Sequence, residues 1–290
     1  SFAKTDKVLK ALNVRKLYLY PRFHAAIRDE LERNEIQVTE LHQDLSMSQN
    51  EIQSAFAVLV MQCVRQLKQA TEHCVAWNNE LSVETCVTQQ FDRAVSQQLE
   101  PVWHRLSPTT KQVVQDLRTL RTLLQALMTY DCVSFWKLLN SIRTLSAASR
   151  HRSLWLLEAA ADTVFKHAKD RVYRIVKPDP TPEIPNPVSK LEAVLEENPK
   201  WKLLKSVLEE IRDEDDKHDE DDKQEVVRNV LVMVKDQKTV DTLRSYLTEG
   251  RVRTLRRKWL RYLEDCNDRN RSASRTLSEE SRLLLEDEGR

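Results

Sequence analysis

SPTTKQVVQDLRTLRTLLQALMTYDCVSFWKLLNSIRTL, the stretch from Ser107 to Leu145, contains two apolar stripes separated by a short polar break. Within each stripe apolar residues recur at steps of three and four, which places them on one face of a helix. The break ends in Asp131, a residue type that caps helix N-termini. The stretch therefore predicts a helical hairpin with an apolar inner face and a partly basic outer face. The two stripes are Val113, Leu117, Leu120, Leu124 and Leu127, then Phe135, Leu138, Leu139, Ile142 and Leu145.

Only two glycines, Gly250 and Gly289, occur among the 290 residues. Phosphate-cradling loops need several glycines close together, because only glycine lets backbone N–H groups converge on a phosphate. The sequence thus excludes a P-loop, a dinucleotide fingerprint and a nucleophile elbow. The apolar fraction of 40% and the charged fraction of 31% suit a helical, highly solvated protein, whereas the net charge of +1 identifies no partner.

Five cysteines form no CxxC pair. An odd number without that spacing argues against a disulfide framework or a zinc ribbon, and for a reducing compartment. His73 beside Cys74, with Cys86 twelve residues on, is a weak metal motif, and ordinary helix residues are the favoured interpretation. No apolar run reaches the ~18–20 residues of a membrane span, and no signal peptide opens the chain. We therefore predict no metal, cofactor or membrane contact here, and we expect an excised fragment because the chain begins in a charged amphipathic segment.

The first half of the chain is predicted to change from α/β to helical character. Residues 1–45 combine helices near 2–12 and 23–31 with strands at 14–20 and 35–45, the first strand being stopped by Pro21. Residues 46–177 are predicted to be all-α. Beside the hairpin, this part is expected to hold helices at 48–68, 82–99 and 154–176.

The second half is predicted to return to βα character after a proline-rich linker at 178–190. Asn198 is a candidate cap for a helix that begins at Pro199, and an acidic, solvated loop follows at 209–225. The apolar run VVRNVLVMV at 226–234 is typical of a fully buried strand. A last helix at 239–247 is expected to end at Gly250, and residues 251–290 are predicted to be mostly disordered.

The order of these segments resembles a superfamily-two helicase module, in which a helical insertion separates two RecA-like lobes. Three long segments resemble the XPF (xeroderma pigmentosum group F) family of structure-specific DNA repair endonucleases: VRKLYLYPRFH at 14–24, VVQDLRTLRTLLQALMTYDCVSF at 113–135 and LEENPKWKLLKSVLEEI at 195–211. VLVMVKDQKTVDTLRSYL at 230–247 is similar to the first strand and helix of the second lobe. The resemblance implies a mainly α fragment: the end of the first lobe (1–45), the helical insertion (46–177), the start of the second lobe (191–250) and a tail (251–290).

That resemblance also implies a function for the whole protein. Members are helicase-like proteins without ATP hydrolysis, joined to a nuclease domain that uses Mg²⁺ or Mn²⁺ and to hairpin domains that bind a small non-catalytic subunit. They cut one strand near a junction of duplex and single-stranded DNA, in the nucleus, in excision repair, crosslink repair and recombination. The Glu-Arg-Lys motif of the nuclease is absent from this sequence, so no catalytic residue is carried over. Asp236-Gln237-Lys238 stands where active helicases carry an arginine.

The predicted role of this chain is therefore to bind branched DNA and to dock repair scaffold proteins. Lys and Arg would neutralise phosphates without reading sequence, although each single cation can also be a solvated charge. An all-helical interaction scaffold without a nucleic-acid role is the alternative, favoured by the near-neutral net charge. The candidate DNA contacts are Lys111, Arg118 and Arg121 on the hairpin, Lys166, Lys169, Arg171 and Arg174 on the last strong helix, and Arg15, Lys16 and Arg22 at the lobe edge.

A second basic cluster opens the tail. Its apolar neighbours Trp259, Leu260 and Leu263 give it an amphipathic pattern, so a nuclear-import signal, a DNA contact and a helix that binds a partner are all open interpretations. The cluster consists of Arg251, Arg253, Arg256, Arg257, Lys258 and Arg261.

Overall fold

The structure is a computed structural model that describes residues 2–21, 23–33, 37–75, 77, 82–88, 90–148, 152–176, 190–218 and 229–273. The described chain is mainly helical, as predicted. It divides into two compact units, Ser1–His42 and Gln43–Arg290. The first unit contains helices α1 (Phe2–Ala11) and α2 (Ala25–Arg33).

The two strands predicted for the first 45 residues are wrong wherever the structure describes them. Residues 14–20 and 37–45 have an irregular backbone, and Tyr18 and Leu19 are 68% and 75% exposed. Alternating residues show that a segment suits a sheet, but a strand forms only when a second backbone accepts and donates its ladder hydrogen bonds. No described backbone pairs with either segment.

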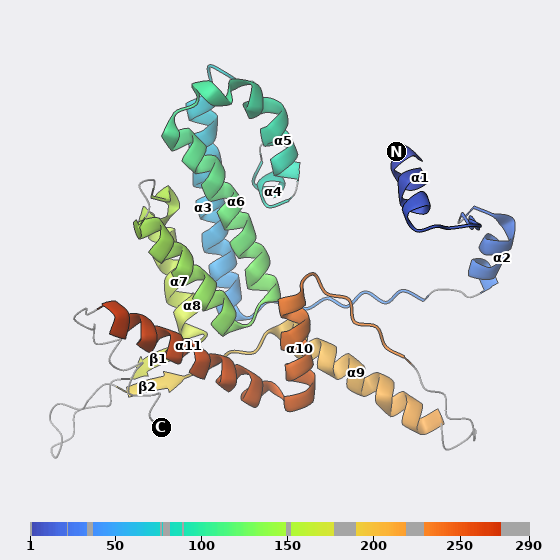
Figure 1. Ribbon diagram of the computed structural model, residues 1–290. Coiled ribbons are helices and arrows are strands. Elements are labelled where there is room, and N and C mark those ends of the chain that lie inside the picture. Colours follow the sequence, from blue (N-terminus) through green and yellow to red (C-terminus); the bar gives the residue numbers. More distant parts are fainter. Residues whose placement is uncertain are drawn as a thin grey trace, which may run out of the picture. The chain divides into compact units, whose positions relative to one another are not determined.

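The core of the second unit is built by α3 (Met47–Thr71), α6 (Pro108–Thr129), α7 (Cys132–Ala148) and α8 (Ala159–Asp170). Helix α3 packs against α6 and α8, and α7 packs against the same two helices (Figure 1). Ser46 and Gln49 form a capping box at the start of α3, and the Ser107 hydroxyl accepts the Thr110 N–H at the start of α6. The predicted hairpin is therefore confirmed as α6 and α7, with Asp131 accepting the Ser134 N–H at 2.8 Å. Leu145, predicted on the apolar inner face, is an exception because it is 69% exposed.

The helix predicted at 82–99 is interrupted. Helix α4 (Val83–Cys86) is followed by its C-cap residue Val87, and α5 (Gln90–Leu99) is followed by the 3₁₀ turn η1 (Glu100–Arg105). The Thr88 hydroxyl accepts the Gln90 N–H at 3.3 Å, so this threonine satisfies a backbone donor at the new helix start. Helix α4 packs on both α3 and α6.

The helix predicted at 154–176 is correct only in its centre. A 3₁₀ turn, η2 (Leu154–Leu157), precedes α8, and strand β1 (Tyr173–Val176) follows it. Strand β1 pairs antiparallel with β2 (Lys190–Ala193), with Tyr173 opposite Ala193. The prediction that 46–177 is all-α is therefore wrong at β1, because this short ladder pairs its backbone. The predicted linker reaches β2 at Lys190, and residues 178–189 lie outside the described ones.

Helix α9 (Pro199–His218) begins as predicted but runs on into the predicted acidic loop. The Asn198 side chain accepts the Lys200 N–H at 3.1 Å, which confirms the cap. Glutamate is a good helix former, so a high acidic content does not by itself exclude a helix. The loop prediction is wrong for residues 209–218, while 219–225 lie outside the described residues. Residues 229–234 are irregular rather than a buried strand, with Met233 85% exposed, and 226–228 again lie outside.

The last two described elements are helices that pack on each other. Helix α10 (Gln237–Glu249) stops at Gly250, whose φ of 83° is the left-handed conformation that favours glycine, as predicted. Residues 251–273 form helix α11 (Arg251–Ala273) instead of the predicted disorder, because Leu255, Trp259 and Leu263 give it a buried face. Residues 274–290 lie outside the described ones. No helix of the described ranges is long and apolar enough to cross a membrane.

Candidate nucleic-acid interface

The two hairpin arginines that were candidates for DNA contact are both paired within the fold. Arg118 Nε donates to one carboxylate oxygen of Asp92 at 3.0 Å, and Arg121 Nη2 donates to the other at 2.6 Å. Arg121 Nη1 also donates to the Thr88 carbonyl at 3.0 Å. Burial alone would raise the pKa of Asp92, but the hydrogen bonds from Arg121 and Arg118 hold that pKa below its ordinary value. These hydrogen bonds join α5 to α6 and engage Arg121 at both Nη atoms, whereas the Arg118 side chain is 37% exposed. The contact of either arginine with DNA stays a prediction.

The third hairpin candidate, Lys111, has a different neighbour. Its ammonium lies 5.7 Å from the ring centroid of Trp103, close enough for a cation–π contact. No acid among the described residues forms an ion pair with this half-buried lysine, so its positive charge is not neutralised there.

The four candidates of the last strong helix are separated by the structure. Lys166 is exposed and Lys169 half-buried on α8, whereas Arg171 follows the helix and Arg174 lies exposed on β1. The Arg171 side chain is fully buried, and its Nε donates to Glu196 at 3.0 Å. Burial and the ion pair with Glu196 disfavour Arg171 as a DNA contact, and the candidacy of all four cations stays a prediction.

Three candidates fall in the first unit. Arg15 and Lys16 are exposed in the irregular segment between α1 and α2. Arg22 lies outside the described residues, so these predictions stay untested.

The basic cluster at 251–261 is divided by α11 into paired and unpaired cations. The Lys258 ammonium points inward, 2.6 Å from Asp131 and 2.7 Å from the Thr242 hydroxyl. Arg257 donates to Glu249 at 2.6 Å, and Arg251 lies 3.8 Å from Glu197. Half of the cluster is therefore occupied by contacts within the fold.

The other half, Arg253, Arg256 and Arg261, forms what we name the arginine ridge. All three side chains are exposed, and none has an ion-pair partner among the described residues. They border one shallow hollow of about 360 Å³, together with Arg257, Leu260 and a single acid, Glu264. The eight residue steps from Arg253 to Arg261 rise about 12 Å along the helix, so the ridge can face neighbouring phosphates of one strand. The signal in the sequence for the helix that carries the ridge was the spacing of Leu255, Trp259 and Leu263, which follow each other at steps of four residues.

A rigid inner face supports the ridge. Trp259 stacks on Tyr262 with ring centroids 5.6 Å apart and lies 5.2 Å from the Tyr173 ring of β1. Lys137 of α7 also pairs with Asp265 of α11. The ridge is therefore carried by a helix that is packed on the core on its other side, which fixes the backbone positions from which the three arginines extend.

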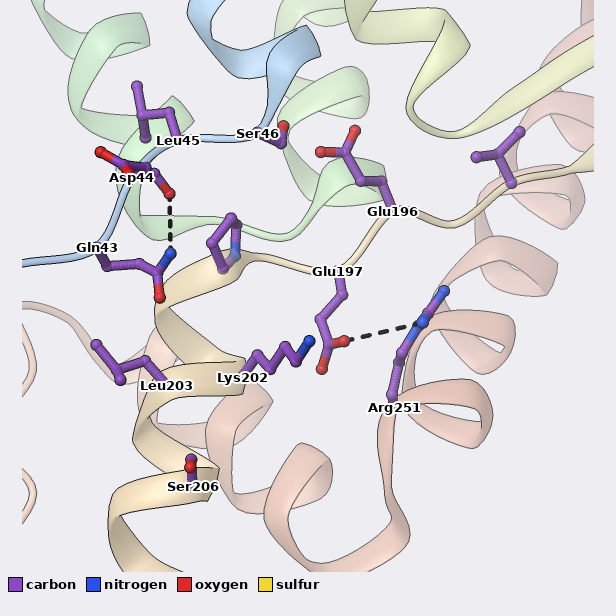
Figure 2. Close-up of a pocket in the computed structure, with 12 residues that line it drawn as sticks. Gln43, Asp44, Leu45, Ser46, Glu196, Glu197, Lys202, Leu203, Ser206 and Arg251 are labelled. Carbon is purple, nitrogen blue, oxygen red and sulfur yellow. Dashed lines mark hydrogen bonds and ion pairs between the residues drawn. The ribbon is translucent and has the colours of Figure 1, made fainter.

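A larger hollow of about 710 Å³ lies between the segment at 43–46, the start of α9 and the start of α11. Figure 2 shows Arg251 directed at Glu197, with Lys202 on the neighbouring helix. Asp44 and Glu196 also line the hollow, so acids outnumber the two cations. This charge balance makes the hollow a poor phosphate site compared with the arginine ridge.

The described residues bring no three His, Cys, Asp or Glu side chains together as metal ligands. Cys86, which belonged to the weak metal motif, is buried, and burial raises the pKa of its thiol to about 12. His73 and Cys74 are exposed at the end of α3. With its thiol protonated, the Cys86 side chain packs in the core as a small apolar group.

Comparisons with known proteins identify relatives that match most of the chain. No family model matches it. The chain is 37% identical over 255 residues to the "DNA repair endonuclease XPF" of Cricetulus griseus, which covers 86% of this chain and 27% of that protein. It is 34% identical over 294 residues to the "DNA repair endonuclease UVH1" of Arabidopsis thaliana, a match that covers 90% of this chain and 30% of that protein. It is 38% identical over 249 residues to the "DNA repair protein rad16" of Schizosaccharomyces pombe, a match that covers 83% of this chain and 27% of that protein. The chain therefore spans less than a third of the length of these relatives.

Proposed function

The chain belongs to the XPF family of DNA repair endonucleases, and from this premise we propose that it is a non-catalytic part that binds branched DNA through the sugar–phosphate backbone. The observation that carries the proposal is the arginine ridge, three exposed arginines without acidic partners among the described residues, on one side of α11. Arginine suits phosphate because its planar guanidinium can donate two parallel hydrogen bonds to phosphate oxygens.

Binding of this kind carries no sequence information. Each phosphate that an arginine neutralises releases condensed counterions, so affinity depends steeply on salt and little on the bases. A repair protein that acts at junctions of any sequence needs such a contact, and the relatives are named as DNA repair endonucleases. Lys166 and Arg174, exposed on α8 and β1, are the secondary contacts of the proposal.

The setting of this surface is proposed from the resemblance. Residues 1–45 and 191–250 would be pieces of two RecA-like lobes on either side of the helical insertion. The high exposure of Leu19 (75%) and Leu231 (83%) supports this, because apolar segments that suit strands are expected to be covered in a complete sheet. The whole protein would act in the nucleus, in excision repair, crosslink repair and recombination, with a small non-catalytic subunit and with repair scaffold proteins docked on the helical part.

The hydrolysis that the family name implies is assigned to no residue of this chain. The sequence lacks the Glu-Arg-Lys motif that the resemblance gives to the nuclease domain, and no cluster of three potential metal ligands occurs among the described residues. We therefore propose a binding role for this chain and assign no catalytic step to it.

The proposal is tested by binding of the 290-residue chain to three DNAs of equal length: a splayed-arm junction, a blunt duplex and a single strand. We expect the junction to bind most tightly at low salt and all binding to weaken steeply as salt rises. Binding of none of the three at low salt would overturn the proposal in favour of an interaction scaffold without a nucleic-acid role.

A further inference from the structure

The start of α6 carries an aromatic and basic cluster that the proposed function does not use. Trp103 lies in η1, the 3₁₀ turn whose second residue is Pro101, and it is 37% exposed. The other five tryptophans are all less exposed. Trp77 is half-buried, with its ring N–H donated to the Thr71 hydroxyl. The remaining four are at most 5% exposed: Trp136, Trp155, Trp201 and Trp259.

The 3₁₀ turn holds the backbone of Trp103 against the core. Val102 packs against the core, Leu106 is buried, and the Leu106 N–H donates to the Trp103 carbonyl at 3.3 Å. The ring therefore has a fixed base and an exposed part, which is how a stacking platform is built. His104 and Arg105 are exposed beside it in the same turn.

Lys111 is the movable member of the cluster. Its ammonium lies 5.7 Å from the ring centroid of Trp103, and no ion pair to Lys111 occurs among the described residues. A cation–π contact at an exposed site is weak, so little opposes its exchange. When a planar base takes the place of the ammonium on the ring, the lysine stem is long enough for the charge to reach an adjacent phosphate.

We propose that Trp103, with Arg105 and Lys111, is a site for unpaired nucleotides, in which a base stacks on the indole ring and the two cations hold the flanking phosphates. This inference rests on the proposed DNA-binding function and gives it a second contact that recognises the single-stranded side of a junction. Stacking is tolerant of sequence because every base has a π-face, which agrees with binding that recognises DNA shape.

The site is separate from the arginine ridge. Lys111 stands in the first turn of α6, whereas Asp131, which binds Lys258 of α11, directly follows the hairpin turn at the other end. A helix of 22 residues is about 33 Å long. A duplex bound at the arginine ridge and an unpaired base stacked on Trp103 are therefore two separate contacts. Substitutions can abolish either contact without the other.

The test is the tryptophan fluorescence and affinity of the full 290-residue chain with a ten-nucleotide thymidine strand and, separately, with a blunt duplex. We expect the single strand to quench part of the fluorescence. Trp103→Leu, which keeps an apolar side chain in the turn, should abolish this quench and weaken single-strand binding about tenfold, while duplex affinity stays within about twofold. Trp103→Tyr, which keeps a stacking ring, should bind the single strand within about threefold of the parent.

Matched variants separate stacking from folding and from charge. Trp77→Phe should leave both the quench and the affinity unchanged, and the thermal transition of Trp103→Leu should remain cooperative. Single-strand affinity and quench that are unaffected in Trp103→Leu would overturn the site. Duplex binding without any single-strand binding by the parent would overturn it as well, while leaving the proposed function intact. Failure to bind either DNA would remove both.

Discussion

The ammonium of Lys258 lies 2.6 Å from a carboxylate oxygen of Asp131, and this ion pair fixes helix α11 to the turn of the helical hairpin. The Asp131 side chain is 3% exposed, and its second oxygen accepts the Ser134 N–H at the start of α7. One carboxylate therefore caps a helix and anchors the helix that carries the arginine ridge.

Removing the cation of this pair should destabilise the protein strongly. In Lys258→Met, Asp131 would remain buried without its countercharge, and we expect the free energy of unfolding to fall by about 2–4 kcal/mol. Arg256→Met, on the same helix but exposed and without an acidic partner among the described residues, should change it by less than about 0.5 kcal/mol. Urea unfolding measures both. Equal effects of the two substitutions would contradict the anchoring role of Lys258.

Arg121 should contribute to stability rather than to DNA binding. Arg121→Ala removes the hydrogen bonds to Asp92 and to the Thr88 carbonyl, so we expect a loss of about 1 kcal/mol in unfolding free energy and no change in duplex affinity. Gln115→Ala, an exposed position on the same helix, serves as the control. A large loss of affinity in a variant of unchanged stability would restore Arg121 as a DNA contact.

The stability that Asp92 provides should depend on pH. The pKa of Asp92 in the folded protein is lowered, so its contribution is complete above the unfolded value of about 3.9 and is lost as pH falls through the lower, folded value. The difference in unfolding free energy between the parent and Asp92→Asn should therefore shrink below about pH 4. A difference that stays constant from about pH 6 to about pH 3 would argue against the two arginine contacts.

Thiol reactivity should report the packing of the helical core. Cys63, Cys86 and Cys132 are buried, and burial raises the pKa of each to about 12, whereas Cys74 is exposed. At about pH 8 iodoacetamide should label Cys74 rapidly and the three buried thiols only on unfolding, as peptide mass spectrometry can follow. Fast labelling of Cys132 in the native protein would contradict the hairpin packing.

The helical core was predictable because its information is local. Stripes at steps of three and four over 17–25 residues leave little choice but an amphipathic helix, and α3, α6 and α7 form where the pattern placed them. Asp131 and Asn198 were also recognisable, since caps depend on residues two or three positions away. The segment that forms helix α11 has the same periodic spacing of apolar residues. Disorder was nevertheless predicted there, because the segment is so rich in charged residues.

Strands and charge pairs were not predictable because they depend on distant residues. The apolar runs at 14–20 and 229–234 suit a sheet, but their partners are a matter of tertiary structure. Likewise, Arg118 forms an ion pair with Asp92, which is 26 residues away in the sequence, and Lys258 forms one with Asp131, which is 127 residues away. Sequence spacing identifies which cations share a helix face, and only the fold shows which of them have an acidic partner.

Phosphate binding by the arginine ridge should be visible in the salt dependence of duplex binding. The triple variant Arg253→Gln, Arg256→Gln, Arg261→Gln should lose affinity at every salt concentration, and the slope of log K against log salt should become shallower by about 3. A double variant of the paired arginines, Arg251→Gln and Arg257→Gln, should change that slope by less than about 1. A triple variant with the parent's affinity and slope would contradict phosphate binding by the ridge.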